Sequence, residues 1–554
     1  MKTTLLLFSG LITGLAHAQT FGYLDINQVK ARVNAGGDLH YDSTYTSPTY
    51  QCPATNPKNW TGATNLWIGG IDIGGQLKLA GQTYRQTGID YWPGPLSTID
   101  ATTTSTVVSQ YNRVWKINKS DIDAFLTNVA NGNVQNGTYT IPNSILNWPG
   151  NGDISQNQDQ LLAPFMDVDG DNIYTPMAGD YPLIKGDQAI FTVYNDNYLP
   201  HGSGGHAIGV EIRLMAYAYG PCSITATNSF LNYTTFYNYK IINRNIFALY
   251  DVYGGLFNDS DIGGISPTYT EFVGCDVQDH YAYTYNTSIA SNPAVGVAIL
   301  KSPINTTDGI DNDYDGMIDE VSEELGMSNF MYFNNSFPAI PLSQTGPITS
   351  PQYYQYMTGF WRDGSPLTCG GNGYGGTTPT KFAYPNNTYT NSPCVPSNWS
   401  ETGNGSDKRF TLNSGPFNMP PGAYLELEYA YISSFDSITN NPIGKLDQDV
   451  QALKSIYNST LNQCLNTGIK KQNLQIEFTI APNPTSGLLT INSGKVISGN
   501  VKIEVVDALG KILISENHKE FMTSTINVSE LSSGIYFLKI SSGENTTVKK
   551  FIKE

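Results

Sequence analysis

The chain has 554 residues, of which 14% are charged, and its formal net charge is −17 at pH 7. Such an excess of negative charge repels the phosphates of a polyanion, so the composition argues against a nucleic-acid partner. No apolar stretch is long enough to cross a bilayer as a helix, so we expect no transmembrane segment.

The first 18 residues have the order of a cleaved signal peptide. Lys2 precedes the short apolar run at 5–15, and Ala16-His17-Ala18 places small residues at the two positions that a signal peptidase reads. This order predicts export into the periplasm. We therefore expect the protein to be secreted or displayed at the cell surface.

Residues 19–469 predict a body built mainly of β-strands. Helical periodicity is confined to two segments, 120–130, with Ser120 as its cap, and 446–464. The clearest strand-like segments are 189–194, 208–219, 234–243, 294–300 and 424–432. Many strands with few helices favour packed antiparallel sheets, so we expect an all-β fold with a large sandwich-type body. The polar stretch at 147–159 marks a weak internal boundary.

The six cysteines lie at positions 52, 222, 275, 369, 394 and 464. An even number in an exported chain suggests up to three disulfides. Cys369 and Cys394 flank a loop rich in Gly, Pro and Asn, and they are the one pair that we predict. Free buried cysteines are the alternative.

One acidic loop of the body begins at Asp167. Asp167, Asp169 and Asp171 alternate, Ile173 offers its backbone carbonyl, and Asp180 supplies a further acid. Ca²⁺ takes six to eight oxygen ligands of this kind. The loop therefore predicts a structural calcium site outside an EF-hand. The alternative is a plain cluster of Asx turns.

A second acidic loop follows at 308–320. Asp311, Asp313 and Asp315 alternate, Met317 offers its carbonyl, and Asp319 stands at the ninth position. Carboxylates packed so closely repel one another unless a cation lies among them. The pattern resembles the loops of extracellular calcium-stabilised repeats and predicts a second calcium site. The alternative is an exposed, flexible acidic loop.

The sequence contains no catalytic constellation on which we base an activity. His201 and His206 lie in the Gly-rich stretch HGSGGH without the helical H-E-x-x-H of zinc proteases, although Glu211 on the next strand could approach them. Four tryptophans either stack sugars or belong to the core: Trp60, Trp67, Trp92 and Trp361. The body alone therefore identifies neither a substrate nor a reaction.

The charge balance changes near residue 470. From Lys470 to Glu554 there are ten Lys and eight Asp or Glu, a net of +2, so the preceding part carries −17 − 2 = −19. Seven short strand-like segments, separated by turns, recur between 474 and 554. Such a tail predicts a separate immunoglobulin-like sandwich at 474–554.

Four motifs in the tail occur in a fixed order. They are P-N-P-x-x-G at 482–487, V-x-D-x-x-G-K at 505–511, L-x-x-G-I-Y at 531–536 and a basic ending at 548–553. Together they resemble the type A sorting domain of the type IX secretion system of Bacteroidota. The sorting residues implied by the resemblance are Pro482, Asn483, Pro484, Gly487, Asp507, Gly510, Gly534, Tyr536, Lys549 and Lys550.

This resemblance implies that an outer-membrane translocon recognises the folded tail. It also implies that the tail is commonly removed and that the body is released or attached to surface lipopolysaccharide. An ordinary terminal sandwich domain is the alternative for this tail.

The body is similar to a family of large secreted Bacteroidota proteins that usually carry this tail. The similar segments are 66–86, 91–96, 163–188, 234–244 and 414–422. That resemblance implies a common fold and no activity. We expect a non-enzymatic, calcium-stabilised surface protein that binds or adheres to a glycan or a protein. A secreted hydrolase of polysaccharide or protein is the alternative.

Overall fold

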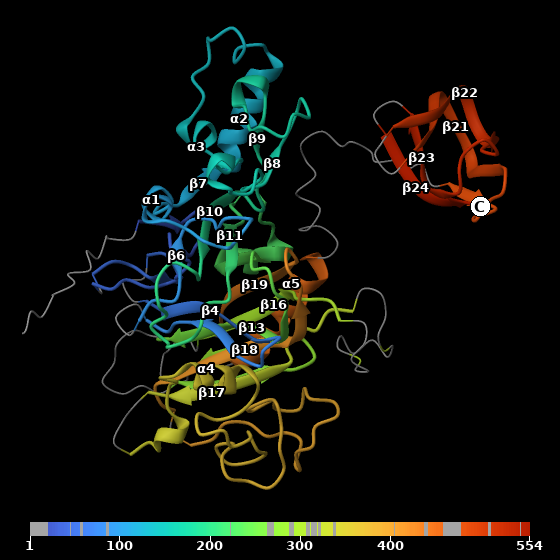
Figure 1. Ribbon diagram of the computed structural model, residues 1–554. Helices are drawn as coiled ribbons and strands as arrows, with labels where there is room; N and C mark the ends of the chain where they lie inside the picture. Colours follow the sequence, from blue (N-terminus) through green and yellow to red (C-terminus); the bar gives the residue numbers. More distant parts are fainter. Residues whose placement is uncertain are drawn as a thin grey trace, which may run out of the picture. The chain divides into compact units, whose positions relative to one another are not determined.

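The structure is a computed structural model in which the chain divides into two compact units, Met1–Leu465 and Asn466–Glu554 (Figure 1). It describes residues 20–554 except 45, 56–58, 85–87, 222, 263–270, 287–292, 306–310, 312–317, 319–322, 336–338, 404, 437–440, 458–477, 508–510 and 543–544. The leader predicted at 1–18 lies outside the described residues. Among those described, no helix is long and apolar enough to span a membrane.

The larger sheet of the body has nine antiparallel strands in the described part of the chain. In spatial order they are β14 (Phe272–Asp276), β15 (Tyr281–Tyr285), β16 (Pro293–Lys301), β19 (Tyr424–Phe435), β12 (Thr234–Asn243), β11 (Val210–Ala218), β10 (Gln188–Asn195) and β6 (Trp92–Pro93), with β7 (Trp115–Asn118) also paired to β10. This sheet forms the middle of the body.

A five-stranded sheet packs against one face of the larger sheet. Its order is β17 (Asn329–Asn334), β18 (Lys408–Met419), β13 (Leu249–Ser260), β4 (Thr61–Asp72) and β5 (Leu77–Gly81). Two small ladders accompany it: β1 (Phe21–Leu24), β2 (Lys30–Asn34) and β3 (Tyr50–Gln51) in one, β8 (Phe165–Met166) and β9 (Tyr181–Pro182) in the other.

The helices of the body are short. They are α1 (Ser105–Gln110), α2 (Lys119–Ala130), α3 (Asn143–Leu146), α4 (Ser350–Met357) and α5 (Pro442–Ile456), with 3₁₀ turns η2 (Ile154–Gln156), η3 (Pro176–Ala178), η4 (Ala226–Tyr233) and η5 (Leu342–Gln344). Helices α2, α3 and α5 contribute to the core on the other face of the large sheet.

Strand β19 shows why the middle sheet reads as a continuous apolar run. Side chains alternate between the two faces of a strand. Tyr429 and Tyr431 point into the core shared with the five-stranded sheet, while Ala430 and Ile432 point into the core beneath the helices. Both faces of this strand are therefore covered, and the body is a layered, mostly β structure as the sequence predicts.

The predicted strands and helices of the body correspond to real elements. The five strand-like segments are β10, β11, β12, β16 and β19. The helix predicted over 120–130 is α2, but its N-cap is Asn118, so the prediction of Ser120 as the cap is wrong. The helix predicted from 446 begins earlier, at Pro442, because the side chain of Asn441 caps it by accepting from the Gly444 N–H.

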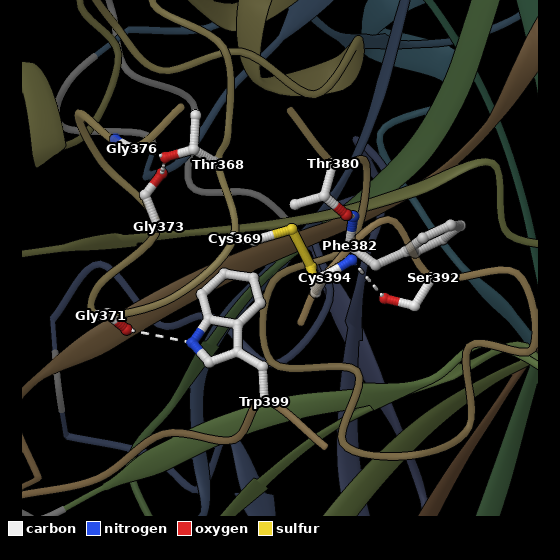
Figure 2. Close-up of a disulfide and its surroundings, with 10 residues drawn as sticks. All are labelled: Thr368, Cys369, Gly371, Gly373, Gly376, Thr380, Phe382, Ser392, Cys394 and Trp399. Carbon is white, nitrogen blue, oxygen red and sulfur yellow. Dashed lines mark hydrogen bonds between the residues drawn. A yellow bond between two sulfur atoms is a disulfide. The ribbon is translucent and has the colours of Figure 1, made fainter. Parts of the chain in front are cut away.

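The predicted disulfide between Cys369 and Cys394 is confirmed (Figure 2). It closes a segment whose ends are 25 residues apart, and the Trp399 indole N–H donates to the Gly371 carbonyl within it. No named helix or strand lies in the described chain between these two cysteines, so we expect the disulfide to stabilise this segment. Cys52 and Cys275 are free and buried. Cys222 and Cys464 lie outside the described residues.

The C-terminal unit is a small β-sandwich of five strands. They are β20 (Thr479–Ala481), β21 (Leu488–Val506), β22 (Ile512–Asn527), β23 (Gly534–Ser542) and β24 (Asn545–Lys553). The prediction of seven strands is wrong because β21 and β22 each run through two of the predicted segments. Their pairing breaks register between 492 and 501, which allows both strands to bend from one layer into the other.

Candidate functional site: the motif end of the C-terminal sheet

The antiparallel register places the four tail motifs at one end of the C-terminal sheet. Val506 at the end of β21 pairs with Phe537 near the start of β23, and Phe537 pairs with Lys550 near the end of β24. The turn that starts at Asp507 follows Val506 directly. We call this the motif end of the sheet.

The opening motif at 482–487 lies along the last strand. The Asn483 side chain accepts from the Ile552 N–H at 2.9 Å and donates to the Lys550 carbonyl at 3.3 Å. Thr485 pairs in parallel with Lys553, donating to the Ile552 carbonyl and accepting from the Glu554 N–H. Pro482, Asn483 and Pro484 are thereby held against the basic ending, although the residues that these Asn483 hydrogen bonds join are 67 and 69 positions apart in sequence.

Further hydrogen bonds fix the turns of the motif end. Asp507 accepts from the Lys511 N–H through its side chain and donates to the Lys511 carbonyl through its backbone. The carbonyl of Gly487 accepts from the Val528 N–H at 2.7 Å. The Asp507 contacts link the end of β21 to the start of β22, and the Gly487 contact extends the pairing of the two strands beyond Leu488 and Asn527. Gly510 lies outside the described residues.

Gly534 and Tyr536 begin β23 beside the end of β24. Gly534 pairs with Lys553, and the Tyr536 hydroxyl donates to the Ser532 carbonyl at 2.9 Å. The Tyr536 ring stacks on Phe551 with 5.8 Å between the centroids, facing the core of the unit. Tyr536 therefore stabilises the motif end from inside the sandwich.

The lysines of the ending are not equivalent. Lys550 is exposed, whereas Lys553 is buried. The Lys549 ammonium lies 5.4 Å from the centroid of the Phe478 ring, a cation–π distance. Lys549 and Lys550 are thus both exposed, and Lys549 already contacts an aromatic ring.

The acidic loop of the body at 167–180 connects β8 to β9. Carboxylate oxygens of Asp167, Asp169 and Asp180 lie within 4.8 Å of one another, and Asp180 is buried. Asp171 is not part of this group, and the Ile173 N–H donates to the Asp171 carboxylate at 2.7 Å. The structure therefore brings together three of the five residues predicted here as calcium ligands.

Backbone amides hold these carboxylates in place. Asp167 accepts from the N–H groups of Gly170 and Asn172, and Asp180 accepts from those of Val168 and Thr175. The bond from Asn172 is the main reason why the pKa of Asp167 is lowered. Desolvation raises the pKa of Asp169, and the nearby charges of Asp171 and Asp180 add to this effect.

The second acidic loop lies mostly outside the described residues. Of its predicted ligands only Asp311 is described, and Asp313, Asp315, Met317 and Asp319 are not. The calcium site predicted in this loop therefore stays a prediction.

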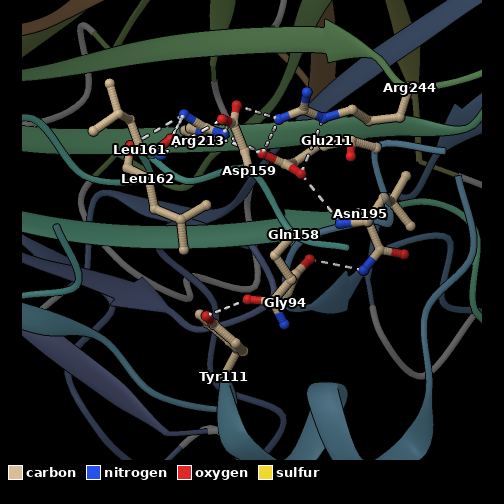
Figure 3. A network of polar contacts seen from close by, with 12 residues as sticks. Gly94, Tyr111, Gln158, Asp159, Leu161, Leu162, Asn195, Glu211, Arg213 and Arg244 are labelled. Atoms are coloured by element: carbon tan, nitrogen blue, oxygen red, sulfur yellow. Dashed lines mark hydrogen bonds and ion pairs between the residues drawn. The ribbon is translucent and has the colours of Figure 1, made fainter. Parts of the chain in front are cut away.

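Glu211 belongs to an ion-pair network with Arg213, Arg244 and Asp159 (Figure 3). Its carboxylate contacts Arg213 at 2.7 Å and Arg244 at 3.1 Å, and both arginines also contact Asp159. Desolvation would raise the pKa of Asp159, but hydrogen bonds from Arg244 and Arg213 lower it overall. Two arginines are thus matched by two carboxylates beside β11 and β12, and this pairing occupies the Glu211 carboxylate.

His201 is buried between two backbone carbonyls. Its Nδ1 is 2.7 Å from the Leu79 oxygen and its Nε2 is 2.5 Å from the Asp196 oxygen. Carbonyl oxygens only accept, so both contacts are hydrogen bonds at once only when both ring nitrogens carry a proton, as in an imidazolium. Burial alone would lower its pKa, but the charges of Asp196 and Asp90 raise it. His206 is exposed, and within the described residues neither histidine belongs to a group of three or more potential metal ligands.

The four tryptophans considered for sugar stacking belong to the interior. Trp60, Trp67, Trp92 and Trp361 are all buried. Trp67 stacks on Phe257 with an interplanar angle of 2°, inside the core between the sheets. These rings contribute to packing and are not available to a ligand at the surface.

The C-terminal unit matches the family described as the secretion system C-terminal sorting domain over residues 479–554. This match agrees with the motifs that the register brings together. The protein is therefore exported to the cell surface or exterior through the type IX secretion system. The match covers the tail only, and the family of the body stays a prediction.

No curated protein sequence matches the chain. Solved structures with similarity include a polysaccharide lyase, at 7% identity and a TM-score of 0.17, covering 62% of this chain and 34% of the lyase. Another is a β-glucuronidase of Faecalibacterium prausnitzii, at 16% identity and a TM-score of 0.12, covering 28% and 31%. The chain spans about a third of each, and neither likeness carries an argument about its activity.

Proposed function

Because residues 479–554 match a sorting domain, we propose that the motif end of this domain is what the type IX outer-membrane translocon recognises when it exports the body. The observation that carries the proposal is the convergence of all four motifs at one end of one sheet. A folded domain presents such a constellation as a single surface, which an unfolded tail does not.

We also propose the steps before and after recognition. The leader at 1–18 directs the chain into the periplasm and is cleaved there. After passage through the outer membrane the tail is removed, and the body is released or attached to surface lipopolysaccharide.

The test of the sorting role is truncation after Phe478 in a bacterium that has this export system. Full-length and truncated chains are compared for the fraction of the body in the medium or accessible to added protease. We expect the truncated body to stay in the periplasm with an unchanged melting temperature. Normal delivery of the truncated chain would refute the proposal.

For the body we propose a non-enzymatic binding or adhesive role toward a glycan or a protein. Support comes from the groups that the sequence offered for catalysis. Glu211 is held by two arginines, and His201 is held between two carbonyls and two aspartates. Such groups stabilise the body and are not free to act on a substrate.

The binding role is tested with the purified body on arrays of polysaccharides and extracellular proteins. We expect saturable binding to one class and no change in the bound ligand. Release of reducing sugar or of peptide from that ligand would show a hydrolase and contradict the proposal.

We further propose that a structural Ca²⁺ binds the loop at 167–180 through Asp167, Asp169 and Asp180. Support comes from the grouping of their oxygens within 4.8 Å, since a hard cation gathers carboxylates at this spacing. Each oxygen that accepts one amide hydrogen keeps a lone pair for a cation. The loop at 308–320 is proposed as the second calcium site.

A further inference from the structure

The outward face of the C-terminal sheet carries an apolar stripe at its motif end. Ile535 on β23 pairs with Ile552 on β24. In the next row, Phe537 on β23 pairs with Val506 on β21, and Val506 pairs with Ile512 on β22. Residues directly opposite each other in paired strands project from the same face. We call these five residues the apolar stripe.

The members of the stripe are not covered by the rest of the unit. Ile512 is 52% exposed, Ile535 is 51% exposed and Ile552 is 40% exposed. Val506 and Phe537 are partly exposed between them. The neighbouring residues Val505 and Leu538 point the other way and are fully buried in the core. The stripe is therefore a second apolar surface, separate from the core of the sandwich.

The same face changes character further along the strands. Glu504 pairs with Lys539 two positions away, and Lys502 pairs with Ser541 beyond them. Glu504 also forms ion pairs with Lys502 at 2.6 Å and Lys539 at 3.7 Å. This part of the face is therefore polar, with two exposed lysines around the buried Glu504, whereas the apolar part lies at the motif end.

We propose that the apolar stripe docks against an apolar protein surface of the outer-membrane translocon, with an acidic residue of that surface opposite Lys550. The inference rests on the proposed sorting function and names the contact surface for it. Ile535 belongs to the L-x-x-G-I-Y motif and Ile552 to the basic ending. Val506 lies within the motif at 505–511, and Ile512 and Phe537 each follow a motif directly. The stripe is therefore formed by the sorting motifs and the residues next to them.

Lys550 indicates the charge of the partner. It pairs with Phe537 in the second row of the stripe, so its exposed side chain projects from the same face. Buried apolar contacts with a charged rim are the usual anatomy of a protein interface. A lysine at this rim steers an acidic surface into place and disfavours a basic one.

The test is the double substitution Ile535→Thr and Ile552→Thr in the full-length chain, expressed in the exporting bacterium. Threonine retains the β-branched shape that strands favour. Removing two central apolar contacts of an interface is expected to lower surface delivery about tenfold or more, with folded protein accumulating in the periplasm.

Met522→Thr is the matched control. Met522 is also an exposed apolar residue of this unit, 49% exposed on β22, but it lies outside the stripe. We expect normal delivery of this variant. The melting temperatures of all variants are also measured. A lower melting temperature of the double threonine variant would explain reduced delivery without a docking surface and would overturn the inference.

The charge is tested with Lys550→Glu against Lys519→Glu, an exposed lysine of β22. Only the first substitution is expected to reduce delivery, by about fivefold or more if an acidic partner lies opposite. Equal delivery of both variants would overturn the acidic contact.

The outcome also separates this inference from the sorting role. If truncation after Phe478 abolishes delivery while the double threonine variant is delivered normally, the sorting role stands and the stripe is not the contact. If light scattering shows that full-length protein is a dimer that the double substitution converts to a monomer, the stripe contacts a second copy, which overturns the assignment to the translocon.

Discussion

The body and the C-terminal unit differ in how far their strands are buried and in where their charged and apolar side chains lie. Every residue of β10 and β11 in the body is buried, and the charges among them are paired internally, as in the network of Glu211 with Arg213 and Arg244. In the C-terminal unit, β22 is mostly exposed and the apolar stripe faces outward. The body has the features of a self-contained fold, whereas the tail has those of a fold made to be recognised.

This difference explains why the function of the tail could be predicted from the sequence and that of the body could not. A surface that another protein must recognise requires particular residues in exposed turns and strand ends, so short motifs mark it. A body stabilised by internal pairing tolerates many solutions for its core, and its sequence carries fewer local signatures. Four predictions test the comparison, beginning with the largest expected effect.

Replacing Glu211 by glutamine should destabilise the body by about 3–5 kcal/mol, because the buried Arg213 and the partly buried Arg244 both lose the fully buried one of their two counter-charges. The matched variant in the tail is Glu504→Gln, whose partners Lys502 and Lys539 are 46% and 42% exposed. Water can solvate those lysines, so the expected cost is about 1 kcal/mol or less. The free energy of unfolding is measured in urea. Equal losses in the two units would remove the contrast between them.

Removing the disulfide with Cys369→Ala and Cys394→Ala should destabilise the body by about 3 kcal/mol, as expected for a loop of this length. The control is Cys275→Ala, a free buried cysteine, measured with and without reducing agent. Reducing agent should lower the melting temperature of the control and leave the double variant unaffected. If reducing agent leaves the melting temperature of the control unchanged, the disulfide does not stabilise the body.

Adding 10 mM Ca²⁺ should stabilise the body by about 2 kcal/mol for a site in the weak range of extracellular modules. Asp169→Asn should reduce this gain while leaving the amide contacts of Asp167 and Asp180 in place. Mg²⁺ at the same concentration is the control. Identical melting curves with calcium and with chelator would exclude both proposed calcium loops.

The smallest effect expected is a pH dependence from His201. The charges of Asp196 and Asp90 raise its pKa, so the stability that it contributes is complete below about pH 6.5 and is lost as the pH rises through the raised value. Tyr91 beside these aspartates has a pKa well above 10 and stays neutral in this range.

The pH effect is measured by comparing the wild-type protein with His201→Gln. The free energy of unfolding of the variant should depend less on pH above 6.5. Parallel pH profiles for the two proteins would show that the ring is not charged in the native state.

Local sequence patterns were enough to predict several strands, the sorting domain and the disulfide. Runs such as 189–194 and 424–432 have the apolar residues that strands require, and each forms a strand. The four motifs identify the sorting domain, because recognition demands specific residues at specific positions. Cys369 and Cys394 could be paired because they flank one short loop.

Only the tertiary structure decided which distant residues meet. Seven predicted tail segments became five strands because β21 and β22 each continue through shifts in the register of their pairing. Arg244 reaches Asp159 across 85 residues, Asp196 and Asp90 enclose His201, and Ile535 meets Ile552 across a turn. Such contacts depend on register and on layer packing, which are properties of the whole fold. No local pattern in the chain specifies them.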